Sequence, residues 1–144
     1  MTSPAAAEIT VLAFDFGTRR IGVAVGNTLV RAAHALATID EERTGERFAR
    51  IAALVDEWQP GLLVVGVPVH ADGSEHPMTQ RARRFARQLE GRFRIPVREA
   101  DERHTTEAAA DEVRASRAGR RGRDERDAIA ARLILQGWFD EHRA

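Results

Sequence analysis

The sequence predicts an α/β protein built on a mixed five-stranded sheet with helices on both faces. Two continuous runs of apolar residues, at positions 9–14 and 62–67, are typical of central strands that are buried on both sides. The order of the elements is the second observation, because three strands in a row are followed by helices that alternate with single strands. Short turns join antiparallel strands, and helical crossovers join parallel ones. We therefore expect strands one to three to be antiparallel and strands four and five to be parallel.

A carboxylate lies at the end of the first of three consecutive predicted strands. The apolar run at residues 9–14 stops at Asp15, so this acid lies at the end of a buried strand. Phe16-Gly17-Thr18 has the composition of a tight turn and leads into a second strand at residues 21–25. Residues 32–39 form a weaker third strand, which completes an antiparallel meander.

An amphipathic helix and a second buried strand come next. The helix is predicted over residues 44–58, because apolar residues recur there at 3-4-3 spacing: Phe48, Ile51, Val55 and Trp58. Pro60-Gly61 ends this helix. The fully apolar strand at residues 62–67 then closes at Pro68.

A polar loop with a turn at Asp72-Gly73-Ser74 separates this strand from the next helix. Apolar residues at helical spacing predict that helix between Met78 and Phe93. Residues 96–100 form a short fifth strand that runs into Asp101-Glu102-Arg103. A second group of acids therefore follows a strand end.

Two helices are predicted in the C-terminal part. Thr105 or Thr106 can cap a helix that reaches about Val113. Residues 116–123 combine two glycines with four arginines and are expected to form a loop. The last helix has an apolar side and carries Asp127 in its first turn, where the helix dipole favours an acid.

Length and composition indicate a single domain, residues 1–144, with a core from about 9 to 140. No apolar run approaches the roughly 20 residues that span a bilayer, and no secretory signal is visible. Cysteine is absent, which excludes disulfides, thiolate zinc sites and cysteine nucleophiles. We expect a cytoplasmic protein.

The charge distribution favours a nucleic-acid partner, although the net charge is zero. All 22 basic residues are arginines, which suit bidentate contacts with phosphate. Seven of them lie between Arg81 and Arg98 beside one acid, and six lie between Arg114 and Arg126 beside two acids. The bias towards arginine can equally reflect coding composition.

Four carboxylates are candidates for one site: Asp15, Asp101, Glu102 and Asp127. The carboxyl ends of parallel strands share one edge of a sheet, and a helix N-terminus can point there too. Three or more carboxylates that meet without a lysine or histidine would repel one another, so such a cluster implies a divalent cation. Oxygen ligands favour Mg²⁺ or Mn²⁺. Two of these acids have a structural alternative when taken alone, which is turn capping for Asp15 and the helix dipole for Asp127.

Several motifs together resemble the YqgF/RuvX family over about residues 9–140. They are LAFDFGTRRIGVAV at 12–25, VVGVP at 64–68 with DGS at 72–74, DER at 101–103, and DAIAA at 127–131 with ILQG at 134–137. This family is similar to RuvC resolvases and ribonuclease H, so the resemblance implies a ribonuclease H-like fold. It also implies that Asp15, Asp101 and Asp127 are catalytic and bind Mg²⁺ or Mn²⁺, with Glu102 as the alternative to Asp101.

The resemblance implies a nuclease that acts on structured nucleic acid, with 5′-end processing of pre-16S rRNA as the first expectation. A Holliday junction resolvase that acts on branched DNA is the alternative, and a non-catalytic module on RNA or ribosomal particles is a further one. We expect a monomer or weak homodimer without a membrane partner. The expected nucleic-acid contacts are Thr18, Arg19, Arg20, Arg103, Arg117, Arg120, Arg121 and Arg123.

Two features complicate this assignment. The turn Asp15-Phe16-Gly17-Thr18 also resembles the first phosphate loop of actin-like ATPases, but a second phosphate loop is missing. In RuvC relatives an acid ends the strand beside the first one, whereas here that strand ends in Gly66 and Pro68. The strand that precedes Asp101 should lie one place further out, about 4.8 Å away. Asp101 or the longer Glu102 must then reach inward, or Asp72 must come in from its loop, and we favour Asp101.

Overall fold

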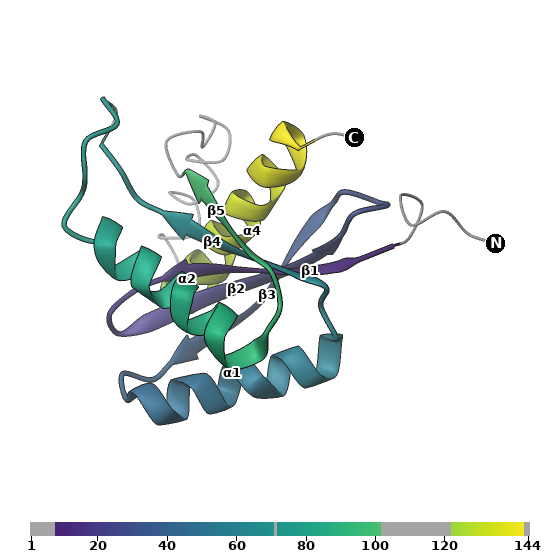
Figure 1. Ribbon diagram of the computed structural model, residues 1–144, viewed down its shortest axis with the longest axis horizontal. Coiled ribbons are helices and arrows are strands. Elements are labelled where there is room, and N and C mark those ends of the chain that lie inside the picture. The colour runs from purple at the N-terminus through teal and green to yellow at the C-terminus, as the bar shows by residue number, and fades with distance from the viewer. Residues whose placement is uncertain (1–7, 71, 102–121, 143–144) are drawn as a thin grey trace.

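The computed structural model describes residues 8–70, 72–101 and 122–142 and contains the predicted sheet (Figure 1). Within these residues each predicted strand is present, and three helices accompany them. In chain order the elements are β1 (Thr10–Phe16), β2 (Arg20–Asn27), β3 (Ala33–Asp40), α1 (Thr44–Trp58), β4 (Leu62–Val67), α2 (Thr79–Phe93), β5 (Val97–Asp101) and α4 (Gly122–Glu141). The helix expected from Thr105 or Thr106 to Val113 lies outside the described residues.

The sheet has the strand order β3-β2-β1-β4-β5. β2 pairs antiparallel with both β1 and β3, while β4 pairs parallel with both β1 and β5. The mixed five-stranded arrangement predicted from the sequence is confirmed, including the position of β5 one place beyond β4. β1 is the middle strand, which explains why its residues from Val11 to Phe14 are apolar and fully buried.

Helices cover both faces of the sheet (Figure 1). Leu12 and Phe14 of β1 point to one face, where they pack in a core with α1 and α2. Val11 and Ala13 point to the other face, where they pack against α4. We call these the α1/α2 face and the α4 face. Because successive strand residues alternate between faces, every other residue of each strand can be assigned to one of them.

α4 begins earlier than expected, which corrects one prediction. It starts at Gly122, so Asp127 is in its second turn rather than its first, and residues 122 and 123 belong to the helix rather than to a loop. The sequence places Asp124 and Glu125 in the first turn, where the helix dipole favours acids. A structural role at the helix N-terminus therefore does not account for Asp127.

In the part of the chain that the structure describes, no helix is both long enough and apolar enough to cross a membrane.

Candidate functional site

Asp15 lies near the carboxyl end of β1 and is partly buried. Its cross-strand neighbours are Gly22 on β2 and Gly66 on β4, so neither flanking strand places a side chain beside it. Asp15 follows Val11 and Ala13 in the strand alternation, which assigns its carboxylate to the α4 face. The carboxylate therefore stands on a part of this face that the adjacent strands leave open.

Asp127 reaches the same place from α4. The helix packs so closely on β2 that a Cβ atom added to Gly22 would lie 1.8 Å from the carbonyl oxygen of Asp127. Gly22 is the residue paired with Asp15, and paired Cα atoms of antiparallel strands are about 5 Å apart. Only a glycine at position 22 allows this contact, which brings the backbone of Asp127 next to the strand position of Asp15.

Arg20 holds the carboxylate of Asp127. Its Nε donates a hydrogen bond to Oδ2 of Asp127 at 2.8 Å, and the two side chains are only 18% and 22% exposed. Arg20 thus has a partner within the protein, in addition to its expected contact with nucleic acid. The pair fixes the orientation of one carboxylate at the site.

The structure does not bring Asp101 to Asp15 and Asp127. Asp101 pairs with Val67, so it lies two strands from Asp15, about 9.6 Å across the sheet. Val97 of β5 packs in the α1/α2 core, and alternation assigns Glu99 and Asp101 to that same face. The cause is the register between β4 and β5, which places the side chains of Asp101 and Asp15 on opposite faces of the sheet.

Asp101 instead borders a small cavity of 200 Å³ together with Glu99 and with Arg83 of α2. Within residues 8–70, 72–101 and 122–142, no group of three or more histidine, aspartate or glutamate side chains is arranged to hold a metal ion. Glu102, the alternative ligand, lies outside the described residues.

The carboxylate of Asp72 is hydrogen-bonded within its own loop. Its Oδ1 accepts hydrogen bonds from the backbone N–H of Ser74 at 2.9 Å and from the Ser74 hydroxyl at 2.6 Å. These bonds lower the pKa of Asp72 below its usual value. The carboxylate is engaged in its own turn, as expected for an Asp-Gly-Ser sequence.

The β1–β2 turn presents Thr18 and Arg19, both exposed. Arg19 lies 3.6 Å from the carboxylate of Asp40, between side chains that are more than half exposed, so this ion pair leaves Arg19 available to a ligand. Four further predicted nucleic-acid contacts, Arg103, Arg117, Arg120 and Arg121, lie outside the described residues. Arg123 belongs to α4, and its side chain is not described.

Arg47 is a residue of this region that the sequence analysis missed. It lies on α1, is 6% exposed, and donates hydrogen bonds from Nη2 to the carbonyl oxygens of Gly17 at 3.0 Å and Thr18 at 3.2 Å. It therefore supports the turn that follows Asp15. A signal was present, because Arg47 precedes Ile51 by four residues and so belongs to the apolar stripe of α1.

Comparisons with known proteins identify the family and the fold of the chain. Residues 9–141 match the model of the family described as "RuvX: Holliday junction resolvase". A relative from Nitrosomonas europaea is 57% identical over 97% of this chain and 94% of its own length, and one from Chromobacterium violaceum is 52% identical over 90% and 96%. Both carry the provisional name pre-16S rRNA nuclease.

Among solved structures, Thermus thermophilus RuvC in complex with a Holliday junction substrate superposes with a TM-score of 0.59. The match covers 92% of this chain and 95% of that one at 16% identity. A second structure of the same protein gives a TM-score of 0.55 at 17% identity. At this level of identity the comparison shows the fold, and the expected ribonuclease H-like architecture is confirmed.

Proposed function

The chain belongs to the RuvX family, and we propose that it is a metal-dependent nuclease that processes the 5′ end of precursor 16S rRNA. One observation carries this proposal: Asp15 from the start of the chain and Asp127 from its last helix meet on one face of the sheet beside Gly22. The nuclease names of relatives that share more than half of their residues with this chain support the same activity.

The donor set at this place fits a hard divalent cation. Asp15 and Asp127 offer carboxylate oxygens, and Gly66 on β4 places no side chain beside Asp15. We assign Mg²⁺ or Mn²⁺ to these two residues. Such an ion, when bound, supplies an activated water and stabilises the leaving oxygen in phosphodiester hydrolysis.

Asp101 or Glu102 would contribute the third carboxylate. Asp101 follows the alternation of β5 to the α1/α2 face, away from Asp15. This favours Glu102, the alternative named from the sequence, which also has the longer side chain.

The arginines of this chain would bind and orient the substrate. Arg20 keeps the carboxylate of Asp127 in place through its hydrogen bond. Thr18 and Arg19, exposed on the turn directly after Asp15, are suited to contact a phosphate next to the scissile bond. Contacts of this kind position a nucleic-acid backbone without reading its bases. We include Arg103, Arg117, Arg120, Arg121 and Arg123 in the same role.

A junction resolvase is the second candidate, favoured by the family description and by the fold shared with RuvC. A resolvase cuts two symmetric strands and should therefore act as a dimer. Oligomeric state separates the two candidates, because a nuclease that trims one RNA end can act as a monomer. A non-catalytic RNA-binding module is the third possibility.

The test compares wild type with Asp15→Asn on a precursor 16S rRNA fragment and on a four-way DNA junction, each with Mn²⁺ and with chelator. We expect the wild type to cut the RNA fragment only with Mn²⁺ and Asp15→Asn to lose this activity by at least about a thousandfold, about 4 kcal/mol in barrier height. Arg87→Gln, an exposed change on α2, serves as the control and should keep full activity.

Equal cleavage by wild type and Asp15→Asn would refute catalysis by this site. Cleavage of the junction but not of the RNA would establish the resolvase instead. RNA binding by both proteins without cleavage by either would establish the non-catalytic module.

A further inference from the structure

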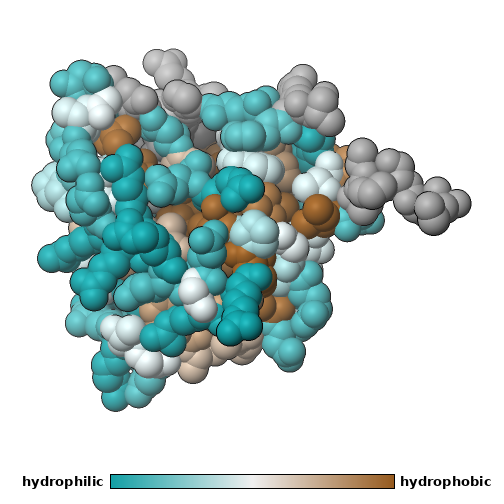
Figure 2. Space-filling model, viewed as in Figure 1, coloured by the Kyte–Doolittle hydropathy of each residue, from teal (hydrophilic) through white to brown (hydrophobic). Residues whose placement is uncertain are grey.

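A second basic site lies on the other face of the sheet. A cavity of 340 Å³ opens between α1 and α2 next to the end of β1. Three arginines border it, Arg47 from α1 and Arg81 and Arg84 from α2, and none of the described residues that line it is an acid. Figure 2 shows strongly hydrophilic residues gathered over the α2 side of the molecule. The volume is that of a small-ligand pocket.

Arg47 is the unusual member of this group. It is 6% exposed, yet its Nε is buried without a hydrogen-bond partner, and its Nη2 donates to backbone carbonyls rather than to a carboxylate. Burial lowers the pKa of Arg47, since removing a guanidinium from water disfavours its charged form. A buried cation with a free donor is stabilised when an anion occupies the space beside it.

Arg81 and Arg84 are exposed at the rim of the cavity. Within the described part of the chain neither forms an ion pair, whereas Arg83 on the same helix contacts both Glu75 and Glu99. The helix thus directs two unpaired arginines to the cavity and a paired one to β5. Two free guanidinium groups beside a buried third one form a site suited to a phosphate.

Three phenylalanine rings also line the cavity, beside Thr44 and Gln88. The ring centroids of Phe16 and Phe85 are 4.8 Å apart, and those of Phe48 and Phe85 are 5.8 Å apart. Arg47 lies over the Phe16 ring, with 5.5 Å between its Cζ and the ring centroid. Apolar walls lower the local dielectric constant and strengthen the attraction between the arginines and an anion.

The cavity and the carboxylate site contain residues that are neighbours in the sequence. Phe16 follows Asp15 directly, so the two side chains lie on opposite faces of the same strand end. The turn that Arg47 supports, residues 17–19, separates the two sites. A nucleic-acid strand that crosses this turn would have one phosphate near Asp15 and another near the cavity.

We propose that the cavity between α1 and α2 is a phosphate subsite that binds the nucleic-acid backbone flanking the cleavage position. The inference rests on the proposed nuclease function, and it adds a second phosphate contact on the other side of the β1–β2 turn. The chemistry recognised is a phosphate, either in a polynucleotide or free in solution.

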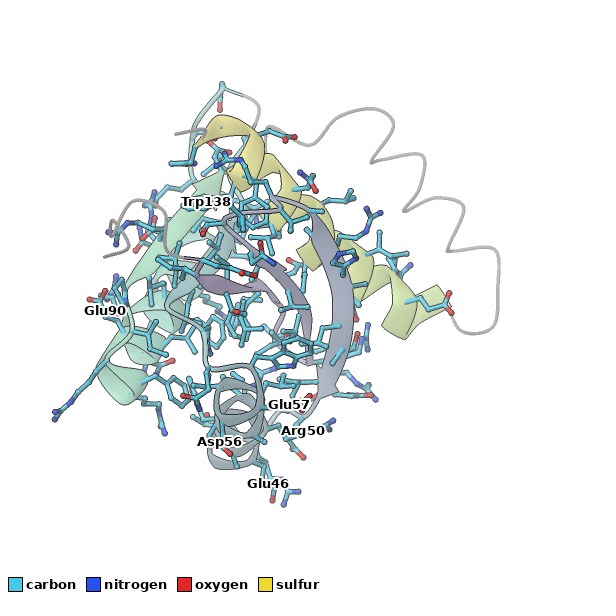
Figure 3. The ribbon with its side chains drawn as sticks, turned by 90° about the vertical axis from the view of Figure 1, so that its right-hand side faces the viewer. Glu46, Arg50, Asp56, Glu57, Glu90 and Trp138 are labelled. Carbon is cyan, nitrogen blue, oxygen red and sulfur yellow. The ribbon has the colours of Figure 1, made fainter. Side chains whose placement is uncertain are left out.

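The test measures binding of a labelled single-stranded RNA octamer by fluorescence anisotropy in the presence of chelator. The pair Arg81→Gln/Arg84→Gln is compared with Arg50→Gln/Arg87→Gln, which removes the same charge from exposed positions of α1 and α2 that do not line the cavity. Figure 3 shows Arg50 pointing outward from α1. We expect the first pair to weaken binding at least tenfold and the control pair less than twofold.

The salt dependence gives a second readout. For the first pair, the slope of log K against log salt should fall by about 1.4, since each phosphate contact to a single strand contributes about 0.7. Equal losses for the two pairs would overturn the subsite, because they would mean that only net charge matters. If inorganic phosphate bound as tightly as the octamer, the assignment to nucleic acid would be overturned.

These outcomes are separate from the fate of the nuclease proposal, because chelator prevents turnover. Selective loss of binding in the first pair, together with a wild type that cleaves nothing, would refute the nuclease and leave the subsite. Equal losses together with Mn²⁺-dependent cleavage would refute the subsite and leave the nuclease.

Discussion

At the residue scale, the ion pair between Arg20 and Asp127 determines how one of the two proposed metal ligands is held. Both side chains are largely buried, so their hydrogen bond is less screened by solvent than the pair formed by Arg19 and Asp40. Arg20 therefore holds a side chain of the site in place and also contributes positive charge to the site. A cation bound by Asp127 would have to share that carboxylate with Arg20.

A double-mutant cycle of Arg20→Gln and Asp127→Asn, measured by urea unfolding in chelator, should give a coupling energy of about 1 kcal/mol. The same cycle on Arg19 and Asp40 is the control, and its coupling should be near zero because the pair is exposed and 3.6 Å apart. A coupling for Arg20 and Asp127 no larger than that of the control would contradict the structural role of Arg20.

The carboxylate of Asp72 is held by Ser74 within its own turn, and this contact can be tested by titration. Its folded-state pKa is lowered by the two bonds from Ser74, so its charged form adds stability above the unfolded pKa. This contribution is lost as the pH falls through the lowered folded pKa. A carboxyl ¹³C titration by NMR should find the Asp72 midpoint higher in Ser74→Ala than in the wild type. An identical midpoint in the two proteins would show that the Ser74 hydroxyl does not stabilise this carboxylate.

At the scale of elements, the contact between α4 and β2 brings the two halves of the site together. Gly22 is the point of closest approach, where α4 occupies the space of a side chain. The obstacle to any larger residue is backbone, which cannot rotate away. The position of Asp127 therefore depends on the absence of a side chain at residue 22.

Gly22→Ala should lower the free energy of unfolding by about 3 kcal/mol, because the added methyl group must displace α4. Gly91→Ala is the matched control, since nothing lies within 4 Å of the Cβ it would add to α2. It should raise stability by about 0.5 kcal/mol through helix propensity. Urea unfolding measures both, and similar small effects of the two changes would contradict the close packing.

The elements also show what the sequence could and could not predict. The apolar runs of β1 and β4 identified the central strands, and the motif beginning at Leu12 identified the family. The face on which Asp101 lies depends on the register of β5 against β4, which is a tertiary property with no local signal. The start of α4 was placed too late because glycines and arginines at residues 116–123 have a loop-like composition.

At the scale of the whole molecule, zero net charge conceals an uneven distribution of arginines. The carboxylate site lies on the α4 face, and the cavity with Arg47, Arg81 and Arg84 lies on the α1/α2 face. Single-stranded RNA that spans both should meet at least three cationic groups. Binding in chelator should therefore weaken with salt along a slope of about −2 or steeper in log K against log salt. Affinity that stays constant between low and moderate salt would contradict a role of these arginines in binding phosphates.

The central claim is that a divalent cation binds on the α4 face between Asp15 and Asp127, and Mn²⁺ broadening of backbone amide NMR signals tests it most directly. The signals of Asp15, Gly22 and Asp127 should broaden first as Mn²⁺ is added, and Asp15→Asn should abolish this effect. Broadening centred instead on Arg83, Glu99 and Asp101, and unchanged in Asp15→Asn, would contradict the account.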